Sequence, residues 1–331
     1  MTAALPAALP AGFTLEPATG AHAPEVHQII AAEQVAAFGF CADTEEDARA
    51  ELEPPPTMDS LQHVVRDGTG RVVQWWFAFH VPGDPLLGTG ITSDPALPDE
   101  VHDELTAAGW GLLLPWLTDH APDGEGPVRA FSGCPAGATA AQRRLAAAGF
   151  THQRTFWEML GPVTGASRTA APVPGLAITG AASSHDVHGV LNEGFVGHWG
   201  FTPLDHDSWL ALEESQSGFD PAFRFLATID GVPAAAMVLS RRLETEDALY
   251  VAELATLAPY RRRGIAAALL AHACEIAHRE GLGRLSLHVD SENSHDAPSV
   301  YRRAGLDVRC AFHGYIAELA RPHPAPFVPG T

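Results

Sequence analysis

The sequence has 331 residues and no lysine, so all 20 basic residues are arginines. A Walker loop binds nucleotide phosphates through a Gly-Lys pair, and the absence of lysine excludes that class of nucleotide site. The spacing Gly-x-Gly-x-x-Gly is also missing, which argues against the usual dinucleotide-binding fingerprint. A phosphate site in this chain must therefore rely on arginine side chains and backbone N–H groups.

Cysteine is scarce, and no run of apolar residues approaches the ~18–20 that a membrane span needs. The four cysteines, Cys41, Cys134, Cys274 and Cys310, are scattered without Cys-x-x-Cys spacing. We interpret them as reduced thiols of a cytoplasmic protein. The 17 histidines show no metal-ligand spacing, so we expect no metal. The first residues lack the basic start of a secretory signal.

Positive charge is also in short supply, because 40 acidic residues outnumber 20 basic ones and give a net charge of −20. Nucleic-acid partners need a basic surface, so we expect none. The acidity favours a cationic substrate such as an amine, although solubility accounts for most of these charges. The use of arginine alone, with abundant Ala, Gly and Pro, indicates a bacterial genome of high GC content.

The most informative segment is Arg261-Arg262-Arg263-Gly264-Ile265-Ala266, which lies between a predicted strand over 249–257 and a predicted helix over 264–280. A glycine-containing turn that opens a helix leaves several backbone N–H groups without partners, and they point the same way. These donors, the helix dipole and nearby arginines favour a phosphate or pyrophosphate. Gly264 allows the anion to approach the backbone closely.

A second segment follows about thirty residues later. After a predicted strand over 284–290 come Asn293, Tyr301, Gly305 and Leu306. The two segments together resemble the GNAT superfamily of acyl-CoA-dependent N-acyltransferases, whose pyrophosphate loop carries Gln or Arg, two residues, Gly, one residue, and Gly or Ala. The loop departs from the family where His295-Asp296 replaces Thr-Gly and Leu306 replaces Phe. Pro259 also stands two residues before Arg261, where three is usual.

The chain divides into two halves that repeat the same order of elements. Residues 161–174 are small and Pro-rich and are predicted to be a linker. Hairpin turns are expected at Asp67-Gly68 and at Asp230-Gly231. The resemblance therefore extends to a tandem arrangement like that of the mycothiol synthase family. It implies an α/β fold of two GNAT-like domains, each a mostly antiparallel central sheet flanked by helices, at 1–160 and 175–320, followed by a Pro-rich tail at 321–331.

The first half lacks the residues that carry the resemblance in the second. At the position of the phosphate loop, residues 93–100 contain three acids and no arginine, and such a loop repels pyrophosphate. The position that matches Tyr301 is Leu145, which has no proton to donate. We predict a degenerate domain with a structural role, or one that forms a wall of the acceptor pocket.

The resemblance implies roles for residues of the second half. Tyr301 would be the general acid that protonates the departing thiolate. Glu253 would be the base, with an ion pair to Arg241 or Arg242 as the alternative. Strand alternation predicts that Glu253 shares a face with Val251, Ala255 and Leu257, and that Tyr250 faces the other way. Acetyl-CoA or another acyl-CoA would contact Thr256, Leu257, Ala258, Arg261, Arg262, Arg263, Gly264, Ile265, Ala266, Ala267, Asn293 and Tyr301.

The acceptor is expected near residues 192–201, which combine acidic, imidazole and aromatic side chains. Glu193 or His198 could hold or deprotonate an amine, and Trp199 could stack on it. A core role for these aromatics is the alternative. The final predicted strand, around residues 312–315, is another candidate wall.

Taken together, these residues predict an N-acetyltransferase that moves an acetyl or small acyl group from acyl-CoA to a primary amine of a small molecule. Two alternatives stay open, which are a peptide or protein N-acetyltransferase and a non-catalytic acyl-CoA-binding module. An open groove lined with acids would favour the peptide enzyme. We expect a monomer or homodimer with no membrane partner.

Overall fold

A computed structural model describes residues 9–293 and 296–321. The first half contains β1 (Thr14–Pro17), α1 (Ala23–Phe38), α2 (Glu45–Leu52), β2 (Asp59–Arg66), β3 (Val72–His80), β4 (Leu86–Ser93), α3 (Asp99–Asp119), β5 (Val128–Pro135), α4 (Thr139–Ala147) and β6 (Thr151–Pro162). The second half contains β7 (Leu176–Gly180), α5 (Ser184–Gly194), α6 (His206–Ser215), β8 (Arg224–Ile229), β9 (Val232–Ser240), β10 (Ala248–Thr256), α7 (Ile265–Arg279), β11 (Arg284–Asp290), α8 (Ala297–Arg303) and β12 (Asp307–Leu319). Short 3₁₀ turns occur at Gly20–His22, Pro221–Phe223, Glu244–Glu246 and Ala258–Tyr260.

Local sequence explains several of these boundaries. The turn between β8 and β9 places Asp230 at φ 51° and Gly231 at φ 83°, the left-handed pair that a tight hairpin needs. The hydroxyl of Thr44 accepts from the N–H of Asp47 at 3.1 Å and caps α2, while the Asp47 carboxylate accepts from the N–H of Thr44 at 2.7 Å. Both halves begin with a strand, two helices and a hairpin, where the sequence predicted a short strand, one or two helices and a hairpin.

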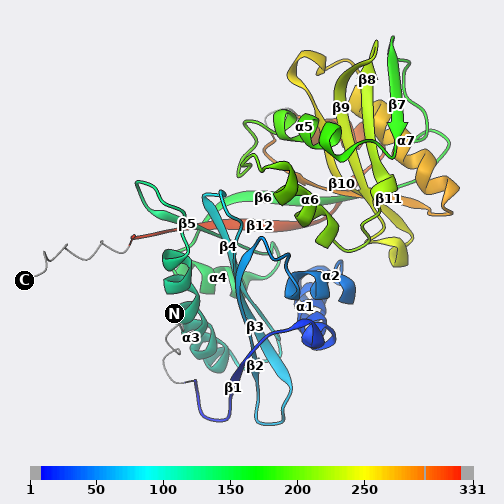
Figure 1. Ribbon diagram of the computed structural model, residues 1–331. Coiled ribbons are helices and arrows are strands. Elements are labelled where there is room, and N and C mark those ends of the chain that lie inside the picture. The colour runs from blue at the N-terminus through cyan, green and yellow to red at the C-terminus, as the bar shows by residue number, and fades with distance from the viewer. Residues whose placement is uncertain (1–8, 294–295, 322–331) are drawn as a thin grey trace, which may run out of the picture.

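Within the described ranges, twelve strands form one sheet in the order β1-β2-β3-β4-β5-β12-β6-β11-β10-β9-β8-β7. The last strand of each half has changed places with its counterpart. The C-terminal β12 pairs with β5 of the first half, and β6 pairs with β11 of the second, while β6 and β12 pair with each other. Figure 1 shows both long strands crossing between the halves. The mixed α/β class and the repeated element order are confirmed, and the strand exchange is an additional finding.

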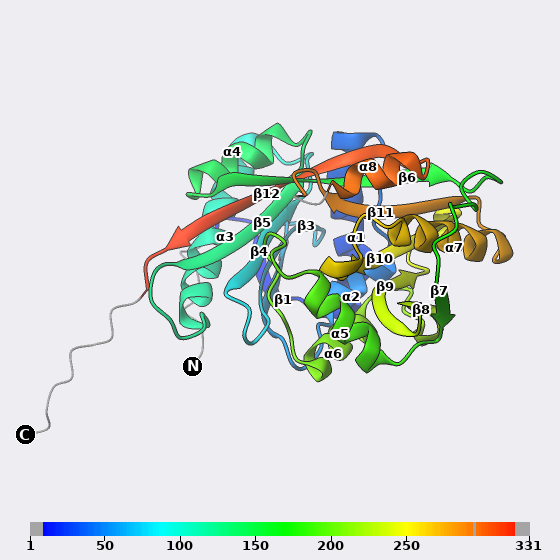
Figure 2. The same ribbon diagram turned by 90° about the horizontal axis from the view of Figure 1, so that it is seen from above.

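Helices cover both faces of the sheet in each half. Contacts join α1 and α3 to β3 and β4, and join α5 and α7 to β9 and β10. Viewed from above, α3 and α7 lie toward opposite flanks, with the α1–α2 and α5–α6 pairs between them (Figure 2). A buried apolar cluster fills the space under α7 and α8, and it includes Met237, Leu249, Leu269, Leu285 and Leu287. No helix within the described ranges is long and apolar enough to cross a membrane.

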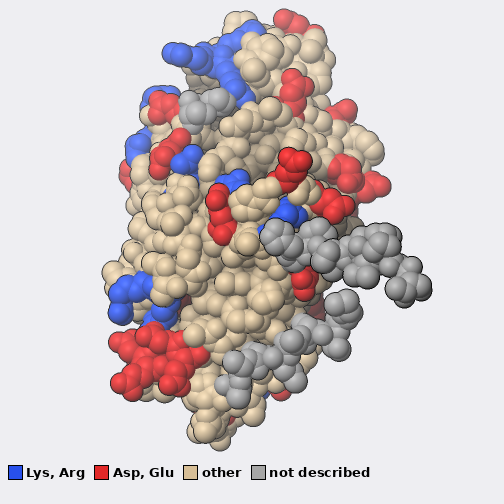
Figure 3. Space-filling model, turned by 90° about the vertical axis from the view of Figure 1, so that its left-hand side faces the viewer, with Lys and Arg blue, Asp and Glu red and all other residues tan. Residues whose placement is uncertain are grey.

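Ion pairs also join the halves. Arg242, after β9, contacts Asp43 at 3.0 Å, just before α2, and Asp47 at 3.2 Å, in the first turn of α2. Arg309 on β12 contacts the buried Glu158 of β6 at 3.1 Å. On the face that Figure 3 shows, a dense acidic cluster lies near one end with basic side chains beside it, and further basic side chains lie at the opposite end. The halves are thus held by shared strands and by partly buried charges.

Candidate active site

A cavity of about 1200 Å³ opens in the second half, among β10, β11, the start of α7, α8 and the linker. This volume exceeds the roughly 300–1,000 Å³ of an ordinary small-molecule pocket, so the space suits a large ligand or two substrates together. The cavity exists because two parallel strands separate. Their ladder joins Ala248–Val251 to Arg284–Leu287 and goes no further, although β10 continues to Thr256.

A β-bulge in β10 determines which side chains face this opening. Tyr250 pairs with Ser240 and Glu253 pairs with Val238, so three steps along β10 match two along β9. Because Ser240 and Val238 lie on one face of β9, Tyr250 and Glu253 share that face as well. The prediction that Tyr250 and Glu253 face opposite ways was therefore wrong. An extra residue in the strand resets the alternation.

Glu253 lines the cavity, and its carboxylate accepts a hydrogen bond from the Trp209 indole N–H at 3.4 Å. Burial raises the pKa of this carboxyl group to about 7. The predicted alternative, an ion pair with Arg241 or Arg242, is not formed. Arg241 contacts Asp220 and Glu280, and Arg242 contacts the two aspartates of the first half. A carboxyl group with a pKa near neutrality can both accept and release a proton at physiological pH.

The loop before α7 has the geometry of an anion site. Arg262 has φ 62° and Gly264 has φ 86°, both in the left-handed region, and Gly264 is the N-cap of α7. The first hydrogen bond of the helix runs from the N–H of Ala268 to the carbonyl of Gly264 at 3.0 Å. The N–H groups of Ile265, Ala266 and Ala267 therefore precede the helical ladder and are available to a ligand. Arg262, Gly264 and these three residues all line the cavity.

Arg261 also lines the cavity, but its guanidinium group binds the backbone. Nε donates to the carbonyl of Thr256 at 2.9 Å, and Nη2 donates to the carbonyl of Gly194 at 2.9 Å. The side chain thus ties the phosphate loop to the end of β10 and to α5. Arg263 is exposed, lies over the Tyr260 ring at 5.6 Å, and is not among the cavity-lining residues.

Three other predicted residues also lie outside the cavity lining. Leu257 and Ala258 follow the end of β10, and the N–H of Leu257 donates to the carbonyl of Ala234 at 2.9 Å. The splayed edge that faces the cavity is instead formed by residues 251–256, which include the predicted Thr256. Glu193 is exposed on α5 and does not line the cavity either. Asn293 does line it, at the turn after β11.

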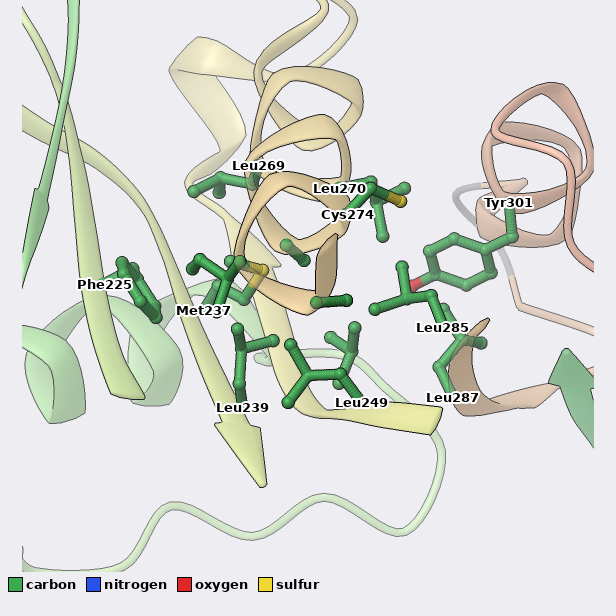
Figure 4. Packing of buried hydrophobic residues seen from close by; sticks show 14 of the residues in the cluster. Phe225, Met237, Leu239, Leu249, Leu269, Leu270, Cys274, Leu285, Leu287 and Tyr301 are labelled. Carbon is green, nitrogen blue, oxygen red and sulfur yellow. The ribbon is translucent and has the colours of Figure 1, made fainter. Parts of the chain in front are cut away.

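Tyr301 reaches from α8 toward Leu285 and Leu287 of β11, beside the apolar cluster under α7 (Figure 4). It is 9% exposed and lines the cavity. Burial raises the pKa of its hydroxyl group to about 12. Tyr301 is therefore neutral, with its proton in place, at any pH near neutrality.

The opposite end of the cavity is aromatic. Trp199 and His198, which the sequence placed near the acceptor, line it together with Phe156 from β6 of the first half. The Trp199 ring lies 6.0 Å from the Phe156 ring, and the guanidinium group of Arg154 lies 5.3 Å from the Trp199 ring. Because β6 is inserted beside β11, the first half contributes directly to this end of the site.

Sequence reasoning missed several lining residues, notably Phe156, His288 and Asp290. The ring of His288 accepts or donates a hydrogen bond at Nδ1 with the Tyr250 hydroxyl at 2.9 Å, and Asp290 lies 3.5 Å from Nε of Arg154. Both stand at alternating positions on β11, where period-two spacing could have suggested a common face. Phe156 gave no such signal, because its role depends on the strand exchange.

The equivalent place in the first half is nearly closed. A cavity of about 50 Å³ lies among β4, α3, β5 and α4. Arg144 on α4 spans the gap to α3, with contacts to Asp99 at 2.9 Å and Asp103 at 2.6 Å. The residue that corresponds to Tyr301, Leu145, is buried in the apolar core. Ion pairs and apolar packing thus occupy the space that is open in the second half.

Known proteins share this architecture. The acetyltransferase (GNAT) family matches residues 185–306. A GCN5-related N-acetyltransferase from Sphaerobacter thermophilus is 22% identical, with 95% of this chain and 98% of that chain covered at a TM-score of 0.76. A tandem GNAT protein from the clavulanic acid biosynthesis pathway is 13% identical, with 92% and 98% covered at a TM-score of 0.68.

A more distant structure belongs to the N-myristoyltransferase of Saccharomyces cerevisiae with bound myristoyl-CoA. It is 10% identical, with 95% of this chain and 80% of that chain covered at a TM-score of 0.55. No curated protein sequence matches this chain. At these identities, the structural matches establish a shared fold.

Proposed function

Residues 185–306 match the acetyltransferase (GNAT) family, and from this premise we propose that the chain is an N-acetyltransferase. It moves an acetyl or small acyl group from acyl-CoA to a primary amine of a small molecule. The observation that carries this proposal is one continuous cavity that Glu253, Tyr301 and the phosphate loop line together. A titratable carboxyl group, a protonated phenol and an anion site are what the reaction needs.

Donor binding follows from the geometry of the loop and the strands. The pyrophosphate of acyl-CoA lies against the first N–H groups of α7, beside Arg262, where Gly264 leaves the approach open. A Cβ atom at Gly264 would meet only Val173 Cγ2, at 3.5 Å. The pantetheine arm then enters between the separated β10 and β11. There the backbone N–H and C=O groups of one strand no longer pair with those of the other. These groups hold the arm and polarise the thioester carbonyl.

The chemical step is direct transfer. The neutral amine nitrogen attacks the thioester carbonyl carbon, and a C–N bond forms as the C–S bond breaks. Glu253 takes the proton that the amine loses, directly or through water, and Tyr301 donates its proton to the departing sulfur. The products are an amide and the free thiol of CoA. Burial of Glu253 supports its role as base, because its pKa of about 7 matches the working pH.

The two alternatives receive less support. A peptide enzyme was expected to show an open groove lined with acids, whereas the lining acids here are Glu253, Asp290 and Asp296, and Asp290 contacts Arg154. A binding module needs no acid–base pair, yet Glu253 and Tyr301 line the same cavity as the phosphate loop. Both features favour a small-molecule enzyme.

The test is a measurement of CoA release from acetyl-CoA with a panel of primary amines and of short peptides. We expect turnover with at least one small amine, and calorimetry with acetyl-CoA should give about one site per chain. Two equivalent sites would contradict the degenerate first half. Turnover with peptides alone would favour the peptide enzyme, and tight binding without any turnover would favour the binding module.

A further inference from the structure

The strand exchange forces the linker across the outer face of the second half. β6 ends at Pro162 beside Arg284 of β11, whereas the next strand, β7, lies at the far edge of the sheet. Residues 163–175 must therefore pass β11, β10, β9 and β8 on the way. α7 covers one face of the sheet there, and a linker that takes this face has to run outside α7.

Several contacts fix this path. The N–H of Val163 donates to the carbonyl of Gly283 at 2.7 Å, just after α7. Arg168 lies 3.7 Å from Glu275 on α7. Val173 reaches the start of the same helix, where it is the neighbour of Gly264. The linker thus follows α7 back from its C-terminal end to the phosphate loop.

Along this path the linker becomes part of the cavity. Thr164, Ala166, Ser167, Thr169 and Ala170 line the same space as the phosphate loop and α8. Thr164 and Ser167 stabilise the turn between them, because the N–H of Thr164 donates to Ser167 Oγ at 2.7 Å and the N–H of Ser167 donates to Thr164 Oγ1 at 3.1 Å. The segment 164–170 is therefore held by its own hydrogen bonds and forms a wall of the cavity that α8 also lines.

We propose that the nucleotide end of the acyl-CoA donor lies between the linker segment 164–170 and α8, so that the linker selects donors that carry the nucleotide. This inference rests on the proposed function, which places the pyrophosphate at the loop and the pantetheine between β10 and β11. The other end of the ligand must then extend away from those strands, and the linker is the wall there. Arg262 and Arg303 also line the cavity and supply positive charge for phosphate groups.

Two adjacent alanines give a matched experiment. Ala170 and Ala171 are both exposed in the linker, but only Ala170 lines the cavity. Dissociation constants are measured by calorimetric competition for CoA and for 4′-phosphopantetheine, which lacks the nucleotide. In Ala170→Glu, the added bulk and negative charge should lower the preference for CoA over phosphopantetheine about tenfold. In Ala171→Glu, the preference should equal that of the wild type.

The preference ratio separates recognition from a loss of structure, since a general disturbance of the fold weakens both ligands equally. Thermal unfolding of both variants provides the check on folding. If the preference for CoA over phosphopantetheine is unchanged in Ala170→Glu, or changes equally in both variants, the inference is overturned and the proposed function is not. Wild-type protein that binds neither CoA nor phosphopantetheine overturns the proposed function and the inference with it.

Discussion

At the scale of single residues, the pKa of Glu253 gives the clearest prediction. Its carboxyl group has a pKa of about 7, raised by burial. Below that pH the group is protonated and cannot accept a proton, so wild-type kcat/KM should fall about tenfold per pH unit. In Glu253→Gln this acidic limb should disappear, and the lost rate should be partly recovered at high pH, where more of the amine is neutral. A pH–rate profile measures both effects.

A matched control for this profile is Glu244→Gln, which neutralises an exposed carboxylate in the turn before β10. We expect its profile to overlay that of the wild type. An acidic limb that persists in Glu253→Gln with the same midpoint would assign the base to another group.

The second residue-scale prediction concerns Tyr301. Tyr301→Phe keeps the buried ring, and its packing against β11, but removes the proton that would reach the sulfur. We expect kcat to fall by on the order of 10²-fold, as for loss of a general acid. The KM for acetyl-CoA should change little, because the phosphate loop is untouched. Steady-state kinetics with saturating amine measure both constants. Near-full turnover in Tyr301→Phe would show that Tyr301 has a structural role and that another group protonates the sulfur.

Sequence spacing located some of these side chains and misplaced others. Gly264 and Tyr301 stand in local motifs whose short-range geometry determines where such residues lie, so their positions at the cavity could be predicted. The orientation of Glu253 was not predictable from alternation, because the bulge between Val251 and Glu253 leaves no mark in composition. Phe156 reaches the site only through pairing between distant strands, which a single sequence does not encode locally.

At the scale of elements, the two ends of α7 offer a controlled comparison. Gly264 precedes the helix with φ 86°, and Gly281 follows it with φ 81°. A side chain at either position costs roughly 1–2 kcal/mol of backbone strain. Only Gly264→Glu places a carboxylate in the phosphate loop. We expect it to abolish acetyl-CoA binding in calorimetry, whereas Gly281→Glu binds with wild-type affinity despite similar destabilisation. Equal binding by the two variants would contradict a phosphate site at this loop.

The positions of strands and helices along the chain could be predicted from the sequence, but the pairing of the strands in the sheet could not. The strand predicted over residues 284–290 is β11 with the same bounds, and the helix predicted over 264–280 is α7 with one residue fewer at each end. Apolar periodicity and glycine stops fix such bounds. Neither of the long final strands, β6 and β12, however, has a sequence pattern that distinguishes pairing within a half from exchange between halves.

At the scale of the molecule, the exchanged strands predict that neither half is complete. A fragment of residues 163–331 lacks β6, which separates β11 from β12 in the sheet, and lacks β5, the other partner of β12. We expect this fragment to aggregate, because two long strand edges are unpaired. Co-expression with residues 1–162 should restore a soluble complex that binds acetyl-CoA. Size-exclusion chromatography and calorimetry test this, and a monomeric fragment 163–331 with full affinity would contradict it.

The same exchange has a consequence for the order of events during synthesis. β5 leaves the ribosome early, but its neighbour β12 follows every other strand of the two halves, so the β5 edge of the nascent first half stays unpaired until then. β6 emerges soon afterwards, yet its destination between β12 and β11 does not exist until most of the second half has followed. Such long-range pairings slow folding and expose strands to wrong partners. We therefore expect the last steps of folding to close both halves together, once β12 has left the ribosome.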